Sequence, residues 1–525
     1  MHAVPRGDTP PFLPSHPDVR AGASRQARLY ALIVGLVLFV SYAYFYQAGG
    51  WNQNSRFALV RAITERGTLQ IDAYEEHTGD RAVYDRHFYS DKAPGLSLAA
   101  VPIVMVARPL LRLVRVSPES YEGIAALSYL ATVGTCGLAT ALAGVCLFFL
   151  ALRFGATRGG AAFGAIAFGL GTPMWTYATL FIGHAVAASC LMFAFSAAVA
   201  LKDAHDPDRR ALLGGAVGFS AGWATITELP AAIPAVLLAL LAMVSVWPHG
   251  RRATVMTAVR LAAGALACAG LLMAYQYACF GSVFHVGYAS EQGFAALHQG
   301  FFGIGVPKLV RLDAILTGQY RGLLPIAPIL GLAPVGLAVL VWRRSSRLPA
   351  IVAILIAAYY VLLNSGYVYW DGGWSYGPRH MSPALPFLAL GLPPLWPQRW
   401  RLPRLILALG AAYGLAPALV AVSVMAQPPD QYLHPMSALL WPAFRAGDLS
   451  INTQDFTSGG ADPDALLYHV YDHAAWNVGQ RWLGLTGLPS LIPLLLMWIL
   501  AAWWWDRIGR AAASRTTTRP IRTES

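Results

Sequence analysis

Long apolar segments separated by short polar ones occupy most of the chain. A helix that crosses a membrane needs about 20 predominantly apolar residues, and the helix candidates are 29–48, 95–113, 123–152, 159–174, 178–201, 211–227, 229–246, 258–280, 323–341, 349–363, 382–396, 402–425 and 488–505. The pattern therefore predicts an all-α polytopic membrane protein with about 12 transmembrane helices and large extracytoplasmic loops.

The charged residues support a membrane protein and set its orientation. Only 12% of the residues are charged, whereas a soluble domain carries about a quarter. The Lys and Arg residues that give the net charge of +12 lie in short clusters between apolar segments, as the positive-inside rule requires. This placement excludes a nucleic-acid partner. It predicts a disordered cytoplasmic tail (1–28), a polytopic domain (29–506) with outer loops at 51–94, 281–322, 364–381 and 427–487, and a second cytoplasmic tail (507–525).

Four apolar segments lie between residues 94 and 202, and four crossings would place the basic cluster 202–210 outside. One of the four should therefore not cross the membrane. We expect it to be segment 95–113, lying re-entrant or along the outer interface. The alternative is that the short, glycine-rich segment 159–174 does not cross.

The first outer loop is the most polar part of the apolar domain. Residues 51–94 carry seven acidic and six basic side chains. The five cysteines all lie in apolar segments, so the sequence indicates neither a disulfide framework nor a cysteine-based metal site.

Two further places carry residues that a purely structural membrane protein does not need. Glu228 lies where two apolar segments meet, and an acid at membrane depth would need a partner; an interfacial carboxylate at the outer turn is the plainer interpretation. The outer loop 364–381 combines closely spaced glycines with aromatic and charged residues. The aromatic residues could simply form a belt at the membrane interface, but such a belt does not explain the glycines and charges. Flat aromatics suit sugar rings and a fixed Arg suits phosphate, so we expect Trp370, Asp371, Trp374 and Tyr376 to bind sugar, and Arg379 and His380 to bind phosphate.

The first outer loop also carries a family resemblance. It ends in Tyr89-Ser-Asp-Lys-Ala-Pro-Gly95, in which Lys92-Ala93-Pro94 loosely matches a Lys-Pro-Pro type motif. Arg56-Phe-Ala-Leu-Val60 and Gly67-Thr-Leu69 look like the helix and turn that follow the family's first span. Over roughly residues 25–200 this resembles the GT-C superfamily of membrane glycosyltransferases, in the branch of aminoarabinose transferases and protein O-mannosyltransferases. The resemblance implies a sugar donor on a polyprenyl-phosphate carrier, a glycan, lipid or protein acceptor, and contact with membrane lipids at the outer face of a bacterial-type inner membrane.

The resemblance also implies site residues. Lys92 is expected to contact the carrier phosphate, with Tyr89 beside it. The family usually has an acidic pair where this chain has Gln53-Asn54, and an amide is no general base. Another carboxylate of the same loop must then serve: Asp72 and Asp91 are favoured, and Asp80 and Asp85 are the alternatives.

Other interpretations stay open. His469-x-x-Asp472-His473 in the last outer loop could bind a divalent cation, although no metal site or cofactor is assigned. The chain could also be a transporter or flippase of lipid-linked sugars, or a non-catalytic membrane protein of envelope assembly.

Overall fold

The computed structural model describes residues 17–397, 401–457 and 474–517. Its helices and strands are α1 (Pro17–Ala43), β1 (Phe45–Tyr46), α2 (Trp51–Arg61), β2 (Arg81–Tyr84), β3 (His87–Ser90), α3 (Gly95–Leu113), α4 (Tyr121–Thr132), α5 (Leu138–Arg153), α6 (Arg158–Leu170), α7 (Met174–Ala178), α8 (Gly183–Ala200), α9 (Pro207–Thr227), α10 (Ala232–Val246), α11 (Arg251–Phe280), α12 (Leu309–Leu316), α13 (Leu323–Ile326), α14 (Ala333–Trp342), α15 (Arg347–Gly366), α16 (Leu385–Ala389), α17 (Arg401–Val424), α18 (Trp441–Ala446), β4 (Trp476–Asn477), α20 (Val478–Leu483) and α21 (Ile492–Thr517).

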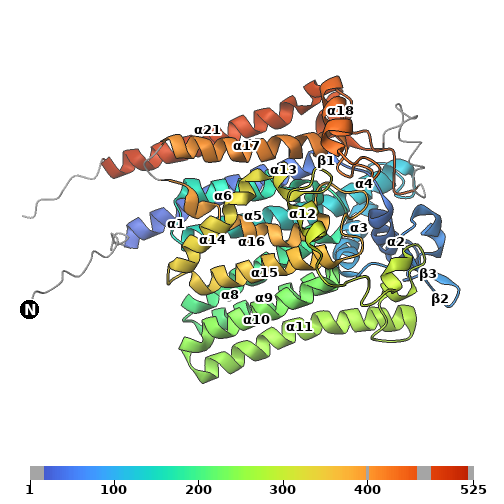
Figure 1. Cartoon of the computed structure of the whole chain (residues 1–525), viewed down its shortest axis with the longest axis horizontal. Helices are drawn as coiled ribbons and strands as arrows, with labels where there is room; N and C mark the ends of the chain where they lie inside the picture. Colours follow the sequence, from blue (N-terminus) through green and yellow to red (C-terminus); the bar gives the residue numbers. More distant parts are fainter. Residues whose placement is uncertain (1–16, 398–400, 458–473, 518–525) are drawn as a thin grey trace, which may run out of the picture.

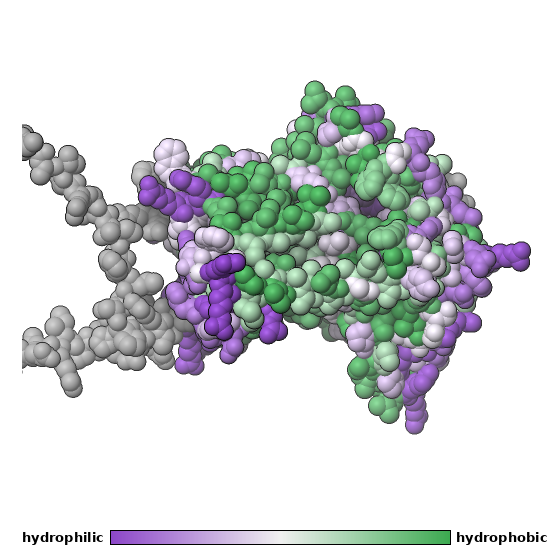
Figure 2. All heavy atoms as spheres, turned by 90° about the horizontal axis from the view of Figure 1, so that it is seen from below, coloured by the Kyte–Doolittle hydropathy of each residue, from purple (hydrophilic) through white to green (hydrophobic). Residues whose placement is uncertain are grey.

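The long helices run side by side as one bundle (Figure 1). α1 and α21 extend toward the same end of the bundle, whereas α2, β2, β3 and α4 lie at the opposite end (Figure 1). We call this opposite end, which carries residues 45–94, the loop end. Apolar side chains cover much of the middle of the molecular surface and polar ones gather toward both ends (Figure 2), as expected for a bundle surrounded by lipid.

Nine helices in the described part of the chain are long and apolar enough to cross a membrane, so the predicted class of all-α polytopic membrane protein is confirmed, but the count of twelve is not. Two predicted segments are broken instead of forming single helices. Segment 323–341 divides into α13, a 3₁₀ turn and α14, and segment 382–396 divides into a 3₁₀ turn, α16 and a second 3₁₀ turn. Both contain several prolines, which remove helical hydrogen bonds.

α3 is long enough to cross the membrane, but both of its ends lie at the loop end. At its start, a Cβ on Gly95 would lie 2.5 Å from Thr227 Oγ1. Near its other end, Arg108 pairs with Glu65 at 3.1 Å, a residue of the π-helix Ala62–Arg66 that follows α2. An orientation of segment 95–113 along the membrane surface would place both ends of the helix on one side in this way; that orientation stays a prediction.

Close helix packing holds the bundle together below the loop end. α8 is the most enclosed of the nine helices, with 83% of its apolar window buried, and it begins at Gly183 beside Glu228. α9 packs closely on α11, because a Cβ on Gly218 would lie 1.9 Å from Leu261 O. Such small-residue contacts let helix backbones approach in lipid, where no hydrophobic force drives helices together.

Helices extend into both predicted tails. α1 begins at Pro17, inside the segment expected to be a disordered tail, and α21 continues to Thr517. The last outer loop contains α18, β4 and α20. Its candidate metal ligands His469, Asp472 and His473 lie outside the described residues.

Candidate active site

A β-hairpin at the loop end brings two carboxylates to one lysine. β2 and β3 pair antiparallel, with Arg81 opposite Ser90, so the residues just beyond this pair, Asp80 and Asp91, meet across the hairpin. The connecting residues Asp85 and Arg86 both have positive φ (49° and 66°), as the two central residues of a type I′ hairpin turn require. The local turn therefore fixes the register that creates the cluster.

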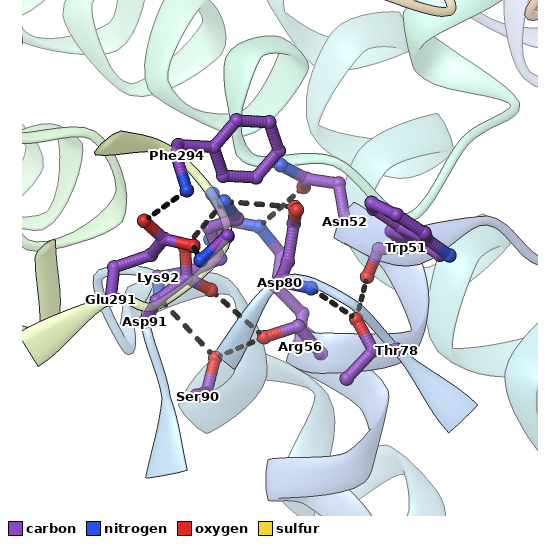
Figure 3. A network of polar contacts seen from close by, with 12 residues as sticks. Trp51, Asn52, Arg56, Thr78, Asp80, Ser90, Asp91, Lys92, Glu291 and Phe294 are labelled. Atoms are coloured by element: carbon purple, nitrogen blue, oxygen red, sulfur yellow. Dashed lines mark hydrogen bonds and ion pairs between the residues drawn. The ribbon is translucent and has the colours of Figure 1, made fainter. Parts of the chain in front are cut away.

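Lys92 lies between these two carboxylates (Figure 3). Its Nζ is 2.8 Å from Asp80 Oδ2 and 2.6 Å from Asp91 Oδ2. The side chains of Lys92 and Asp80 are 8% exposed and that of Asp91 is fully buried. In Figure 3 Asp91 lies on the side of Glu291, whereas Asp80 lies on the side of Asn52 and Trp51. The two carboxylates thus reach the same ammonium group from the two strands of the hairpin.

Hydroxyl groups hold the Asp91 side of the cluster in place. Ser55 Oγ donates a hydrogen bond to Asp91 Oδ1 at 3.2 Å and lies 2.9 Å from Ser90 Oγ. The Lys92 amide in turn donates to Ser90 Oγ at 3.3 Å. Ser55 belongs to α2, so this network ties the hairpin to that helix.

The cluster alters its own protonation. Burial raises the pKa of Asp91 to about 6, with Lys92 lowering it and Asp80 raising it. Burial lowers the pKa of Lys92, but Asp80 and Asp91 raise it by more, so the net shift is upward and the ammonium group stays charged. One cation is thus shared by two acids, and removing that cation would leave two like charges in a buried site.

A second buried ion pair lies beside this cluster. Arg56 NH2 is 2.8 Å from Glu228 Oε1, and Arg56 also donates to Asn52 Oδ1 at 3.0 Å and to Ala93 O at 3.1 Å. A Cβ on Gly183 would lie 2.2 Å from Glu228 Oε1, so the pair needs a glycine at the start of α8. Glu228 is therefore a partnered acid of the site and not simply an interfacial carboxylate.

Three cations act on the charge of Glu228. Burial raises the pKa of Glu228, whereas Arg56, Lys92 and Arg379 lower it, in that order. Geometry brings the Arg379 segment to the same place, because His184 Nδ1 lies 3.7 Å from Glu228 Oε1 and the His184 ring lies 5.4 Å from that of His380. Residues from distant parts of the sequence thus meet at one site.

Arg379 differs from the other two cations. Among the described residues no acidic side chain pairs with it, and its buried Nε has no hydrogen-bond partner. Its stem packs against Gly372, where a Cβ would lie 2.8 Å from Arg379 Cγ. The guanidinium of Arg379 is thus the one cation of this site that is not already neutralised within the described residues.

His380 is uncharged beside Arg379. Burial, followed by the charge of Arg379 and the proximity of His184, keeps the pKa of His380 well below its usual range. The His380 and His184 rings are 5.4 Å apart, and His380 Nε2 is buried without a partner in the described structure. A neutral imidazole can still offer a hydrogen bond to an anion.

A narrow pocket opens next to Lys92. It is lined by Asp91, Lys92 and Pro94, by Leu272, Tyr275, Gln276 and Phe280 of α11, and by the turn that contains Gly287 and Tyr288. Lys92 Nζ lies 5.4 Å from the centre of the Tyr288 ring. A Cβ on Gly287 would lie 2.8 Å from Asp91 O, so this turn packs directly on the backbone of the cluster.

Three residues predicted for the site lie elsewhere. Asp72 is 41% exposed and contacts His87 Nδ1 at 2.7 Å, so the structure does not bring it to Lys92. Tyr89 is buried in a small core, with its ring 5.3 Å from that of Phe280. Asn54 donates to the carbonyl groups of His77 and Asp455 at 2.7 and 2.9 Å, which is a framework contact. Side chains alternate along a strand, which is why Tyr89 turns away from the face of Ser90.

The expected sugar-binding loop is largely folded onto itself. Tyr376 is only 2% exposed, and its carbonyl accepts a hydrogen bond from Tyr177 at 2.9 Å. The Trp374 carbonyl accepts from Gln427 at 3.2 Å and the Asp371 carbonyl accepts from Ser375 at 3.0 Å. Trp370 contacts the ring of Tyr320. Trp370, Asp371 and Trp374 remain partly exposed, whereas Tyr376 has no surface for a sugar.

Several residues of the site were not predicted individually. Asn52, Ser55 and Ser90 lie in stretches whose polarity marked them, but Tyr288 and Glu291 come from the outer loop 281–322, which has no distinguishing motif. Within the described residues no group of three or more His, Cys, Asp or Glu side chains could hold a metal ion.

Comparison with known proteins gives a likeness of fold. The chain matches no protein-family model and no curated protein. Among solved structures it is similar to apo ArnT from Cupriavidus metallidurans, with 18% identity and a TM-score of 0.45 over 81% of this chain and 71% of that one. The same protein bound to undecaprenyl phosphate gives 16% identity and a TM-score of 0.46 over the same shares.

A third similar structure is the archaeal oligosaccharyltransferase AglB from Archaeoglobus fulgidus, in complex with an inhibitory peptide and a dolichol-phosphate. It gives 11% identity and a TM-score of 0.43, over 79% of this chain and 56% of that one. A likeness with TM-scores below 0.5 transfers no residue role to this chain.

Proposed function

We propose that this protein is a membrane glycosyltransferase that moves a sugar from a polyprenyl-phosphate carrier to an envelope glycan, lipid or protein acceptor. The site is proposed to lie at the extracytoplasmic face of an inner membrane. The observation that carries the proposal is the buried Asp80–Lys92–Asp91 cluster, with Arg379 close by. It combines a cation for a departing phosphate with a carboxylate for an acceptor hydroxyl.

Arg379 and Lys92 are proposed to bind the carrier phosphate. Arg379 has no acidic partner among the described residues, and a guanidinium can hold a phosphate through two parallel hydrogen bonds. Lys92 is shared by two acids and would move toward the phosphate when the donor arrives. Both cations then stabilise the negative charge that develops as the sugar–phosphate bond breaks, with the neutral His380 offering a further hydrogen bond.

Asp80 is proposed as the general base. In Figure 3 it lies on the side of Asn52 and Trp51. It does not line the pocket that Asp91 lines, and its side chain is slightly more accessible than that of Asp91. If Lys92 turns toward the donor phosphate, Asp80 and Asp91 become neighbouring like charges, and one of them then binds a proton more readily. Donor binding would thus prepare Asp80 to take the proton of the acceptor hydroxyl.

Asp91 is proposed to position Lys92. Its side chain is fully buried and is held by Ser55, so it cannot reach an acceptor without rearrangement. It fixes the ammonium group at the mouth of the pocket beside α11. That pocket has a cavity volume of only about 20 Å³, so the polyprenyl tail is proposed to lie outside it, along the lipid-exposed face of α11, of which only 11% of the apolar window is buried.

Binding of undecaprenyl phosphate to the purified protein in nanodiscs tests the carrier site, with native mass spectrometry as the measurement. Arg379→Gln removes an unpaired cation and should weaken binding at least tenfold, since a hydrogen bond to a charged group contributes about 1.5–3 kcal/mol. Lys308→Gln, an exposed outer-loop cation, is the matched control. Equal binding by wild type and Arg379→Gln would contradict the phosphate role.

The corresponding Lys92 variant needs a second control, because Lys92→Gln leaves two buried carboxylates without their cation. Breaking a buried pair in this way costs about 3–5 kcal/mol of stability. The double variant Lys92→Gln/Asp91→Asn removes one of those charges. It should fold as well as wild type and still bind the carrier at least tenfold more weakly. Wild-type binding by this folded double variant would exclude Lys92 from the carrier site.

A further inference from the structure

A second pocket lies at the loop end, on elements that the proposed reaction does not use. It has a cavity volume of about 350 Å³ and is formed by residues at the end of α3, the start of α4, β4 and α20. That volume falls within the range of ligand-binding pockets, about 300–1,000 Å³. Six side chains give it its chemical character: Tyr121, Glu122, Tyr129, Trp476, Arg481 and Trp482.

Three of the four aromatic residues of the pocket form one connected wall. The Trp476 ring lies 5.0 Å from the Tyr129 ring and 6.2 Å from the Trp482 ring. Trp482 is nevertheless 65% exposed and Tyr121 is 48% exposed. Large flat apolar faces thus remain open to a ligand inside a concave pocket.

An acidic and a basic side chain, which do not form an ion pair with each other, also line the pocket. Glu122 and Arg481 are both exposed, and within the described residues neither side chain has an ion-pair or hydrogen-bond partner. The acid would repel an anionic headgroup, and an apolar lipid tail would use neither charge. Sugar hydroxyls, by contrast, both donate and accept hydrogen bonds, so they can use a carboxylate and a guanidinium together.

The position of the pocket favours a water-facing ligand. The continuous helical segment Tyr121–Arg153 has 33 residues and is about 50 Å long, whereas the hydrocarbon core is about 30 Å thick. Its other end, Arg153, pairs with Asp203 beyond the end of α8. The first turns of α4, which line the pocket, therefore project beyond the hydrocarbon core at the loop end.

The pocket is also connected to the candidate active site. β1 pairs with β4, with Tyr46 opposite Trp476. Tyr46 is followed five residues later by Trp51, the first residue of α2, and five residues span at most about 18 Å. A ligand long enough to extend from the pocket could therefore approach the Trp51 side of Asp80.

We propose that this pocket binds neutral sugar rings of a glycan acceptor, which rests on the proposed glycosyltransferase function. Trp482 and Trp476 would stack on the rings, while Glu122 and Arg481 would bind their hydroxyl groups. The pocket would hold the glycan chain so that its reacting hydroxyl points toward Asp80.

Binding of neutral oligosaccharides to the full chain in nanodiscs tests this proposal, with maltopentaose, cellopentaose and mannopentaose as probes and saturation-transfer NMR as the measurement. At least one probe should bind wild type, and Trp482→Ala and Arg481→Gln should each weaken that binding at least tenfold. Leu483→Ala is the matched control, because Leu483 is 57% exposed and adjoins Trp482 but does not line the pocket. It should change binding less than twofold.

Absence of binding by all three probes, or equal binding by wild type and Trp482→Ala, would contradict the proposal that this pocket binds sugar rings. The proposed reaction is tested separately, because Lys92→Gln/Asp91→Asn should lose carrier binding while oligosaccharide binding stays within twofold of wild type. If wild type binds an oligosaccharide but transfers no sugar, the proposed function fails and the carbohydrate pocket stands.

Discussion

Conversion of Asp80 to Asn separates catalysis from binding at this site. Asn keeps the size of Asp80 but has no basicity, and general-base catalysis contributes about 10²–10⁴-fold to a rate. That factor corresponds to about 2.7–5.5 kcal/mol in the activation free energy. Asp91 lies 2.6 Å from Lys92 Nζ and is unchanged in this variant, so the proposed carrier-binding cation should stay in place.

The expected result is a loss of at least a hundredfold in single-turnover transfer, with undecaprenyl phosphate binding weakened less than threefold or strengthened. Binding can become stronger because one of the acids that compete for Lys92 is gone. The assay follows radiolabelled sugar from a polyprenyl-phosphate donor in rapidly quenched nanodisc samples.

Asp85→Asn is the matched control for this experiment. Asp85 is exposed in the same loop and has φ of 49°, a conformation that Asn tolerates. It should retain activity within twofold, and so should Asp72→Asn. A rate for Asp80→Asn within threefold of wild type would refute the assignment of the base.

Three further predictions follow from the geometry. Gly372→Ala should weaken undecaprenyl phosphate binding at least fivefold, because the new Cβ would displace Arg379. Gly373→Ala is the control: Gly373 has φ of 60° against 76° at Gly372, but a Cβ there would meet no atom within 4 Å, so binding should not weaken. Equal effects of the two variants in native mass spectrometry would contradict this. Burial raises the pKa of Asp91 from 3.8 to about 6, so between these pH values the native state holds a proton on Asp91 that the unfolded state does not. The free energy of unfolding should therefore fall by about 3 kcal/mol as the pH rises from about 4 to above 6. Scanning fluorimetry should show this loss for wild type and not for Asp91→Asn, and parallel pH profiles of the two proteins would count against it. A cysteine at Asp85 should react with an impermeant reagent from the extracytoplasmic side and one at Ser345 should not, both positions being exposed; the reverse pattern would invert the orientation.

The apolar pattern predicted the class of fold because hydrophobic length is a local property of the sequence. Segment 95–113 was located with the same bounds as α3. Segments 323–341 and 382–396 were predicted as single helices, but their prolines break them. Where breaks are tolerated depends on neighbouring helices that supply packing and hydrogen bonds, which the pattern does not contain.

The site was only partly predictable. Lys92 and Asp91 are adjacent in sequence, so their pairing could be anticipated, and the polarity of the first outer loop marked the region in which the Asp80–Lys92–Asp91 cluster lies. Whether Asp72 or Asp80 lies beside Lys92 depends on the register of the β2–β3 hairpin, and a prediction of helices alone does not provide that register. Tyr89 and Tyr376 resemble ligand-facing aromatics in sequence, but both are buried.

Contacts over long sequence distances were beyond the sequence pattern. Glu228 and Arg56 are separated by 172 residues, and the identity of an acid does not reveal its partner. Gly183, Gly287 and Gly372 matter because side chains or backbone from other segments approach them closely. Such close approaches become visible only once the tertiary structure is known.

Transfer of radiolabelled sugar from a polyprenyl-phosphate donor, measured in membranes that contain acceptor, tests the proposed function most directly. The label should pass from the lipid fraction to the acceptor fraction with wild type, and at least a hundredfold more slowly with Asp80→Asn. Label that changes only its side of the membrane, or that reaches the acceptor equally fast with Asp80→Asn, would contradict a glycosyltransferase centred on the Asp80–Lys92–Asp91 cluster.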